Sequence, residues 1–118
     1  MPVNKKAATE TANNPGAASS DPSGKSVDKL IEELKHGKDE IVRSSAAGTL
    51  GYLKAEKAIT PLIQALKDTH VYVRHGAAWA LGEIKSEKAV GALKQALNDA
   101  DEVTRAKAAE ALAKIQGK

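Results

Sequence analysis

Residues 72–84 read YVRHGAAWALGEI, and related stretches stand 31 positions earlier, IVRSSAAGTLGYL at 41–53, and 31 positions later, VTRAKAAEALAKI at 103–115. All three share an Arg at the third place, paired Ala at the sixth and seventh, and Leu at the tenth. Three in-register copies of a unit rich in Ala and Leu, without alternating β-branched residues, are typical of stacked helical hairpins. This stretch therefore predicts a helical repeat protein.

The other half of the unit repeats as well, as AITPLIQALKD at 58–68 and AVGALKQALND at 89–99. Its apolar residues follow the i, i+3, i+4, i+7 spacing of a helix. We expect three shorter helices at about 26–36, 56–67 and 87–98, and three longer ones at about 39–53, 70–84 and 101–116. Pro61 fits only in or near a first helical turn, Ser26 and Ser86 are candidate N-caps, and Gly117 is a candidate C-cap.

The chain divides into two parts. Residues 1–25 hold three of the four prolines amid small polar residues, and such a segment buries too little apolar surface to offset its ordering entropy. We predict an all-α fold, a right-handed α-solenoid of three helical hairpins (six helices) with a disordered N-terminal tail. The expected boundaries are a tail at 1–25 and a repeat domain at 26–118, with repeats at about 26–54, 55–85 and 86–118.

Composition excludes several classes of function. The 118 residues contain no Cys, which rules out disulfides, thiolate metal sites and cysteine nucleophiles. The net charge is only +3, so charge gives little support to nucleic-acid binding. No apolar run approaches the length of a membrane span, and the tail lacks the apolar stretch of a secretory signal. We expect a cytoplasmic protein that does not enter a membrane.

The three VR-type stretches resemble the second helix of a HEAT repeat, and AITPLIQALKD and AVGALKQALND resemble the first. The match is to the short-period subclass named for phycobilisome lyases, and it covers about 26–118. This resemblance implies that the helices bearing VR line the concave side of a solenoid. It says little about function, because the architecture hosts many unrelated activities.

One string suggests an enzyme. Residues 73–78, VRHGAA, resemble the VRHEAA signature of HEAT-repeat deoxyhypusine hydroxylases, whose paired His and Glu residues hold iron. Here Gly76 stands at the Glu position, and the aligned pairs 44–45 and 106–107 supply no ligand. A metal site needs about three ligands, which His75 alone does not provide. We therefore predict no catalytic residue, no metal, no cofactor and no enzymatic activity.

The aromatic residues mark a candidate binding face. At about 100° per residue, the core side of the central long helix is centred on Val73, Ala77, Leu81 and Ile84. All three aromatics of the chain then project away from the core and share one face, where Trp and Tyr typically dominate binding energy. The alternative is that Trp79 lies flat across the neighbouring Gly48. The candidate partner-binding residues are Ile41, Gly48, Tyr52, Tyr72, His75, Gly76, Trp79 and Glu83.

Recurrent Arg and Asp residues suggest a structural ladder, formed by Arg43, Arg74, Arg105, Asp68 and Asp99. Each Asp precedes an Arg of the next long helix by six residues. We expect the Asp to cap amides of the following helix and the Arg to reach carbonyls or carboxylates of the adjacent unit.

These features favour a non-enzymatic adaptor that binds a protein or peptide on its concave face. The runner-up is a lyase-type accessory protein that holds a tetrapyrrole or another flat cofactor against the same aromatics. Nucleic-acid binding and hydroxylase activity rank below both. Self-association through the solenoid ends stays open.

Overall fold

The computed structural model describes residues 25–117, so the predicted disordered tail at 1–25 lies outside the described residues apart from Lys25. The described residues form six α-helices and two short 3-10 helices, which confirms the predicted all-α fold of three hairpins. In chain order they are α2 (Val27–His36), α3 (Glu40–Tyr52), η2 (Glu56–Ala58), α4 (Ile59–Ala65), α5 (Val71–Ile84), η3 (Glu87–Ala89), α6 (Val90–Ala96) and α7 (Glu102–Gln116).

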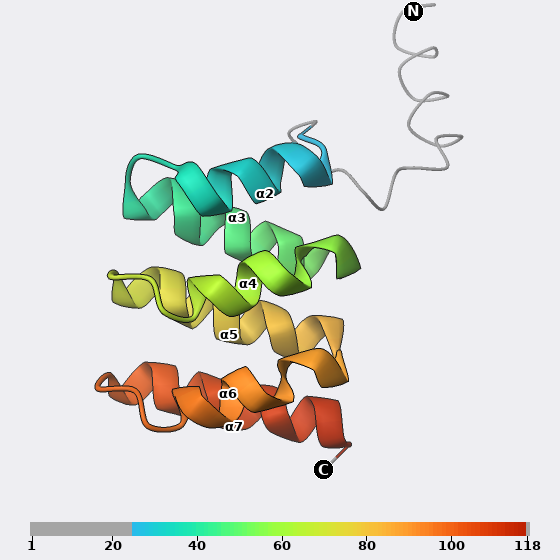
Figure 1. Ribbon diagram of the computed structural model, residues 1–118, viewed down its shortest axis with the longest axis vertical. Coiled ribbons are helices and arrows are strands. Elements are labelled where there is room, and N and C mark those ends of the chain that lie inside the picture. Colours follow the sequence, from blue (N-terminus) through green and yellow to red (C-terminus); the bar gives the residue numbers. More distant parts are fainter. Residues whose placement is uncertain (1–24, 118) are drawn as a thin grey trace, which may run out of the picture.

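The hairpins stack into two layers. In Figure 1, α2, α4 and α6 lie in front of the longer helices α3, α5 and α7. Within the long-helix layer α3 packs on α5 and α5 packs on α7, while each short helix packs on the long helix of its own hairpin. The central helix α5 is therefore flanked on two sides by long helices and covered on a third by α4.

A ladder of leucines fills the space between the layers. Leu50 and Leu81 have no exposed surface and Leu112 has 7%, and the three occupy the same place in successive long helices. Val73 and Ala77 are also fully buried, which confirms the predicted core side of α5. Each fully buried Leu contributes roughly 1.5–3 kcal/mol relative to an exposed one.

The two later short helices begin with a 3-10 turn instead of running as single helices over 56–67 and 87–98. Pro61 is the third residue of α4, within the first turn as predicted, where its missing N–H has no partner inside the helix. The same break precedes α6, where Ala92 replaces Pro61, so the break belongs to the repeat and not to the proline.

The helix ends follow ordinary capping chemistry. The Ser26 hydroxyl accepts a hydrogen bond from the Lys29 N–H at 3.1 Å, and Gly117 ends α7 with a φ of 74°. Ser86 caps η3 by accepting from the Lys88 N–H at 3.2 Å. All three assignments confirm the sequence prediction.

The N-caps of the long helices differ from the prediction. Asp39, His70 and Asp101 occupy these positions, and the first and last each accept a backbone N–H at 2.9 Å. Asp68 and Asp99, predicted as caps, instead accept the N–H of His70 and Asp101 in the preceding turn. They sit two residues too early to reach the orphan amides of the helix.

Candidate interaction face

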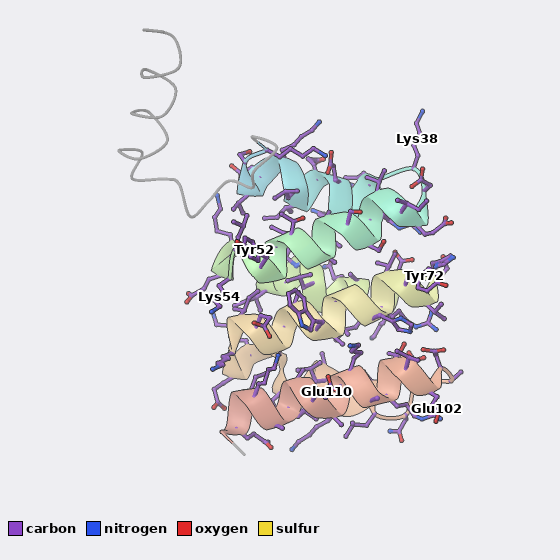
Figure 2. The ribbon with its side chains drawn as sticks, turned by 180° about the vertical axis from the view of Figure 1, so that it is seen from behind. Lys38, Tyr52, Lys54, Tyr72, Glu102 and Glu110 are labelled. Carbon is purple, nitrogen blue, oxygen red and sulfur yellow. The ribbon has the colours of Figure 1, made fainter. Side chains whose placement is uncertain are left out.

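The solvent-facing side of α3, α5 and α7, here called the long-helix face, carries most of the exposed large apolar side chains. Among the described residues, Ile41 is 68% exposed, Tyr52 71%, Tyr72 61% and Val103 45%, and all four lie on this face. A fifth, Leu97, ends α6 and is 38% exposed. Figure 2 shows Tyr52 and Tyr72 projecting from this side of the molecule.

Three of these side chains form a row across the solenoid. Ile41, Tyr72 and Val103 are each the second residue of their long helix, and they stand 31 residues apart. Because α3, α5 and α7 pack side by side, these residues line one edge of the face. We call Ile41, Tyr72 and Val103 the edge row.

Tyr52 lies at the opposite end of the face from Tyr72 (Figure 2). It is the last residue of α3, 11 residues beyond Ile41, which corresponds to about 16 Å at the rise of an α-helix. The sequence predicted that the aromatics share one face. The two tyrosines lie on that face but at its opposite ends, because sharing a side of a helix does not fix the height along its axis.

Trp79 does not project away from the core as the sequence predicted. It is half-buried and packs against the core cluster, with its ring over Gly51 of α3. A Cβ added at Gly51 would lie 2.8 Å from the Trp79 ring. The cause is that α5 packs against long helices on two sides, so a smaller part of its circumference faces solvent than a helical wheel of α5 alone indicates. Gly48, on which the alternative placed the ring, has no side-chain neighbour near its Cβ position.

Two glycines that the sequence reasoning missed set the spacing of the long helices. A Cβ at Gly51 would lie 2.6 Å from the Ala80 Cα, and a Cβ at Gly82 would lie 2.9 Å from the Ala111 Cα. Both distances are shorter than real contacts allow, so only glycine permits this approach. Their 31-residue separation was the signal that could have revealed them.

His75 and Glu83, predicted to contact a partner, are engaged with α7. The His75 Nε2 lies 2.6 Å from the Asp101 Oδ2, and the Glu83 carboxylate pairs with the Lys114 ammonium. The hydrogen bond from His75, together with the Thr104 N–H, lowers the pKa of Asp101 to about 2. The hydrogen bond from Lys114 lowers the pKa of Glu83.

Rings and carboxylates gather around the middle of the edge row. The centroid of the Tyr72 ring lies 5.2 Å from that of His70 and 5.8 Å, edge-on, from that of His75. His70 Nε2 lies 3.8 Å from the Glu40 carboxylate on α3. Gly76, in contrast, faces α3, since a Cβ there would lie 3.2 Å from that of Ala47.

The recurrent Arg and Asp residues connect consecutive units. Arg43 holds Asp68 through two hydrogen bonds, Nε to Oδ2 at 2.9 Å and the second guanidinium nitrogen to Oδ1 at 3.1 Å. Arg74 Nε lies 3.1 Å from the Asp99 carboxylate as an ion pair without the alignment of a hydrogen bond. Burial would raise the pKa of Asp68, but hydrogen bonds from Arg43 and the His70 N–H lower it overall.

Each ladder Arg also donates to a carbonyl six residues earlier in its own unit: Arg43 to Gly37, Arg74 to Asp68, and Arg105 to Asp99. Within residues 25–117, Arg105 binds carbonyls alone, those of Asp99 and Ala100. The guanidinium groups thereby brace the turn between the two helices of each unit.

Two grooves that the sequence did not reveal open on the short-helix layer. One, of about 260 Å³, lies between α2 and α4 and is lined by Leu34, Lys35, His36, Pro61, Gln64, Ala65 and Asp68. The other, of about 110 Å³, occupies the equivalent place between α4 and α6. Residues 25–117 hold no cluster of three or more His, Asp or Glu side chains that could bind a metal ion.

Comparison with known proteins agrees with this architecture. Residues 27–113 match the sequence pattern of HEAT repeats, while no curated protein matches the chain. HEAT repeats commonly serve as scaffolds for protein interactions. In the part of the chain that is described, none of the helices has the length and apolar character needed to cross a bilayer. A match over most of the chain, together with three stacked hairpins, establishes that this protein belongs to the HEAT repeat family.

Proposed function

We propose that this protein is a non-enzymatic adaptor that binds a protein or peptide on its long-helix face. The observation that carries the proposal is the gathering of Ile41, Tyr52, Tyr72 and Val103 on that one face. Exposed apolar clusters usually mark interaction sites, and Tyr is among the residues that contribute most to binding energy.

Comparison of the three units supports the same face. Core positions repeat one residue type, as at Leu50, Leu81 and Leu112, whereas the position two residues later, on the long-helix face, is Tyr52, then Glu83, then Lys114. The fold restricts the first set, because those side chains pack between the layers. The outward positions are free to be specialised for a partner.

The contacts within the protein rank the candidate residues. Tyr52, Tyr72 and Ile41 are free to contact a partner because most of their surface is exposed. Trp79 offers a partner only the part of its ring that Gly51 does not cover. His75 and Glu83 are held by α7, so we propose that they shape the face more than they anchor a partner.

Site-specific photo-crosslinking tests this proposal. A photoreactive phenylalanine analogue replaces Tyr52 or Tyr72 in turn, with exposed Thr60 on α4 as the control position in the other layer. After irradiation in native lysate, we expect the same protein adduct from positions 52 and 72 and none from position 60. Equal adducts at position 60, or no adduct at 52 and 72, would overturn the proposal.

The lyase-type alternative has a separate test. A flat conjugated cofactor held against Tyr72 would give the purified protein an absorbance band above about 350 nm, where side chains do not absorb. Such a band would favour a cofactor-binding function over the adaptor function. The phycobilisome-lyase-like subclass and a cytoplasmic location both stay predictions from the sequence.

A further inference from the structure

We propose that Arg105, at the C-terminal end of the stack, binds a carboxylate of the partner: an Asp or Glu that stands beside an apolar side chain in a segment that is not a further repeat. The inference rests on the proposed function for the existence of a protein or peptide partner, and it adds a charged contact at the end of the solenoid. The repeats themselves supply the comparison that carries it, because the same Arg stands in all three units.

Arg105 is the third member of a ladder whose first two members each hold a carboxylate from the following unit. Arg43 binds the Asp68 carboxylate through two hydrogen bonds, at 2.9 and 3.1 Å, and Arg74 Nε forms an ion pair with Asp99 at 3.1 Å. Arg105 has no following unit. Within residues 25–117 its Nε and Nη2 have no hydrogen-bond or ionic partner.

The Arg105 guanidinium is nevertheless held as in the other two units. In each ladder Arg, Nη1 donates to the carbonyl six residues earlier, at 2.7–3.0 Å. The Nε and Nη2 side of Arg105 is therefore positioned like that of Arg43, which makes the two parallel bonds that a guanidinium favours with a carboxylate. Because the side chain is already fixed, little of its conformational freedom is lost when a carboxylate binds.

Apolar surface is exposed where that carboxylate would lie. In the two complete units, the carboxylate and a leucine of the preceding short helix line the same groove, Asp68 with Leu34 and Asp99 with Leu66. These leucines are 3% and 5% exposed. Leu97 is the equivalent residue at the end of the stack and is 38% exposed. An apolar side chain next to the partner's carboxylate would cover it.

The charges around this place favour an anionic ligand. Lys94 replaces Ile63, which lines the groove between α4 and α6, so a second cation borders the site. The carboxylates of Asp99 and Asp101 are already bound within the protein, which leaves Glu102 as the free acid of this turn. Two cations, the ladder Arg and Lys94, therefore stand against one free carboxylate.

Neither a further repeat nor a second copy of the chain fits this end. Gly51 and Gly82 let the next long helix approach until an added Cβ would lie 2.6 and 2.9 Å from one of its Cα atoms. The equivalent residue of α7 is Ala113, whose methyl group keeps another helix from this spacing. The first unit also has His36 at the place of the ladder Asp, so a second copy would bring no carboxylate to Arg105. The occupant is therefore a segment of a different protein.

A synthetic peptide tests the proposal with the full chain. The probe is a short fluorescent peptide built from Asp, Leu and Ala, and the control peptide has Asn in place of every Asp. Binding is followed by fluorescence anisotropy. We expect the Asp peptide to bind, and Arg105→Gln to weaken it at least about tenfold, as for an anchor residue. Lys38→Gln is the matched control, since it removes one positive charge at an exposed site of the first unit and should change affinity less than about twofold.

A second variant separates binding from stability, because Arg105 also braces its own turn. Arg105→Lys keeps the charge and a donor for the Asp99 carbonyl but not two parallel bonds. It should lose affinity severalfold while its thermal melt stays like that of the parent.

Four results would overturn the proposal: no binding of the Asp peptide, equal binding of the Asn peptide, an equal loss in Lys38→Gln, or indifference to both Arg105 variants. Self-association in sedimentation that Arg105→Gln abolishes would assign this end to a second copy and overturn it as well. If crosslinks still form at positions 52 and 72 in any of these cases, the adaptor function stands and only the Arg105 contact is wrong.

Discussion

The two junctions between long helices are built on the same core but are closed by different chemistry. Between α3 and α5, the Trp79 ring covers Gly51 in an apolar contact. Between α5 and α7, a hydrogen bond and an ion pair close the same side, His75 with Asp101 and Glu83 with Lys114. We call them the apolar junction and the ionic junction.

This difference shows which positions the repeat restricts. Both junctions need a glycine at equivalent places, Gly51 and Gly82, because the next helix approaches too closely for a Cβ. Both also need the buried leucine ladder. The outward positions can be aromatic or charged without altering the helix spacing, so a repeat protein can vary its surface while its stacking stays the same.

The largest effect is expected where the two junctions share a residue. Leu81 is fully buried in α5, the helix that belongs to both junctions, so Leu81→Ala leaves a cavity in the core. We expect it to lower the free energy of unfolding by about 2–5 kcal/mol. Chemical denaturation beside the parent protein measures the loss. A loss below about 1 kcal/mol would mean that the site collapses to fill the cavity.

Trp79→Ala breaks the apolar junction alone. If Trp79 pointed outward, as the helical wheel predicts, the free energy of unfolding would fall by no more than about 1 kcal/mol. Because its ring packs on Gly51, we expect a loss of about 1–3 kcal/mol instead. Thermal melts would measure it against Tyr72→Ala, an exposed residue of the same helix that should melt like the parent. Equal melting of both variants would mean that the Trp79 contact contributes little.

Gly51→Ala overfills the apolar junction instead of emptying it. The added methyl would lie 2.6 Å from the Ala80 Cα, so α3 and α5 must separate, at a cost of about 1–3 kcal/mol. Gly48→Ala is the matched control in the same helix, since its Cβ meets open space and should stabilise the helix by about 0.5–1 kcal/mol. Opposite signs for the two substitutions in urea denaturation would establish the close approach, and equal signs would contradict it.

Lowering the pH should have the smallest effect on stability, and it should affect the ionic junction but not the apolar one. The pKa of Asp101 is lowered to about 2 in the folded protein, below its unfolded value near 3.9, so its contribution is present above about pH 4 and is lost as the pH falls toward 2. Asp101→Asn, which keeps an N-cap, should therefore be destabilised relative to the parent at pH 6 but not at pH 2.

The loss in Trp79→Ala should be the same at both pH values, because nothing at Gly51 titrates. Denaturation curves of both variants at pH 2, 4 and 6 make the comparison. A pH-independent loss in Asp101→Asn would show that the ionic junction depends on shape rather than on charge.

Much of the fold followed from intervals within the chain. The 31-residue register gives Leu50, Leu81 and Leu112 equivalent positions, and all three are buried, while the helical period puts Tyr52 and Tyr72 outside the core. The candidate site was harder to predict. The helical period places Trp79 on the same side of α5 as Tyr72. It does not show that the two neighbouring helices cover part of that side, including most of Trp79.

What the sequence by itself determined is whatever depends on local periodicity: helices with 3.6 residues per turn, their stacking as HEAT hairpins, and the identity of the core. What only the tertiary structure decided is which side chains meet across units, such as Arg43 with Asp68, Trp79 with Gly51, and His75 with Asp101. The physical reason is that backbone geometry fixes contacts only over a short distance along the chain. A pair within one helix is fixed by the rise and twist of the backbone, whereas a pair across helices depends on an interhelical distance that Gly51 and Gly82 set to within the width of a methyl group.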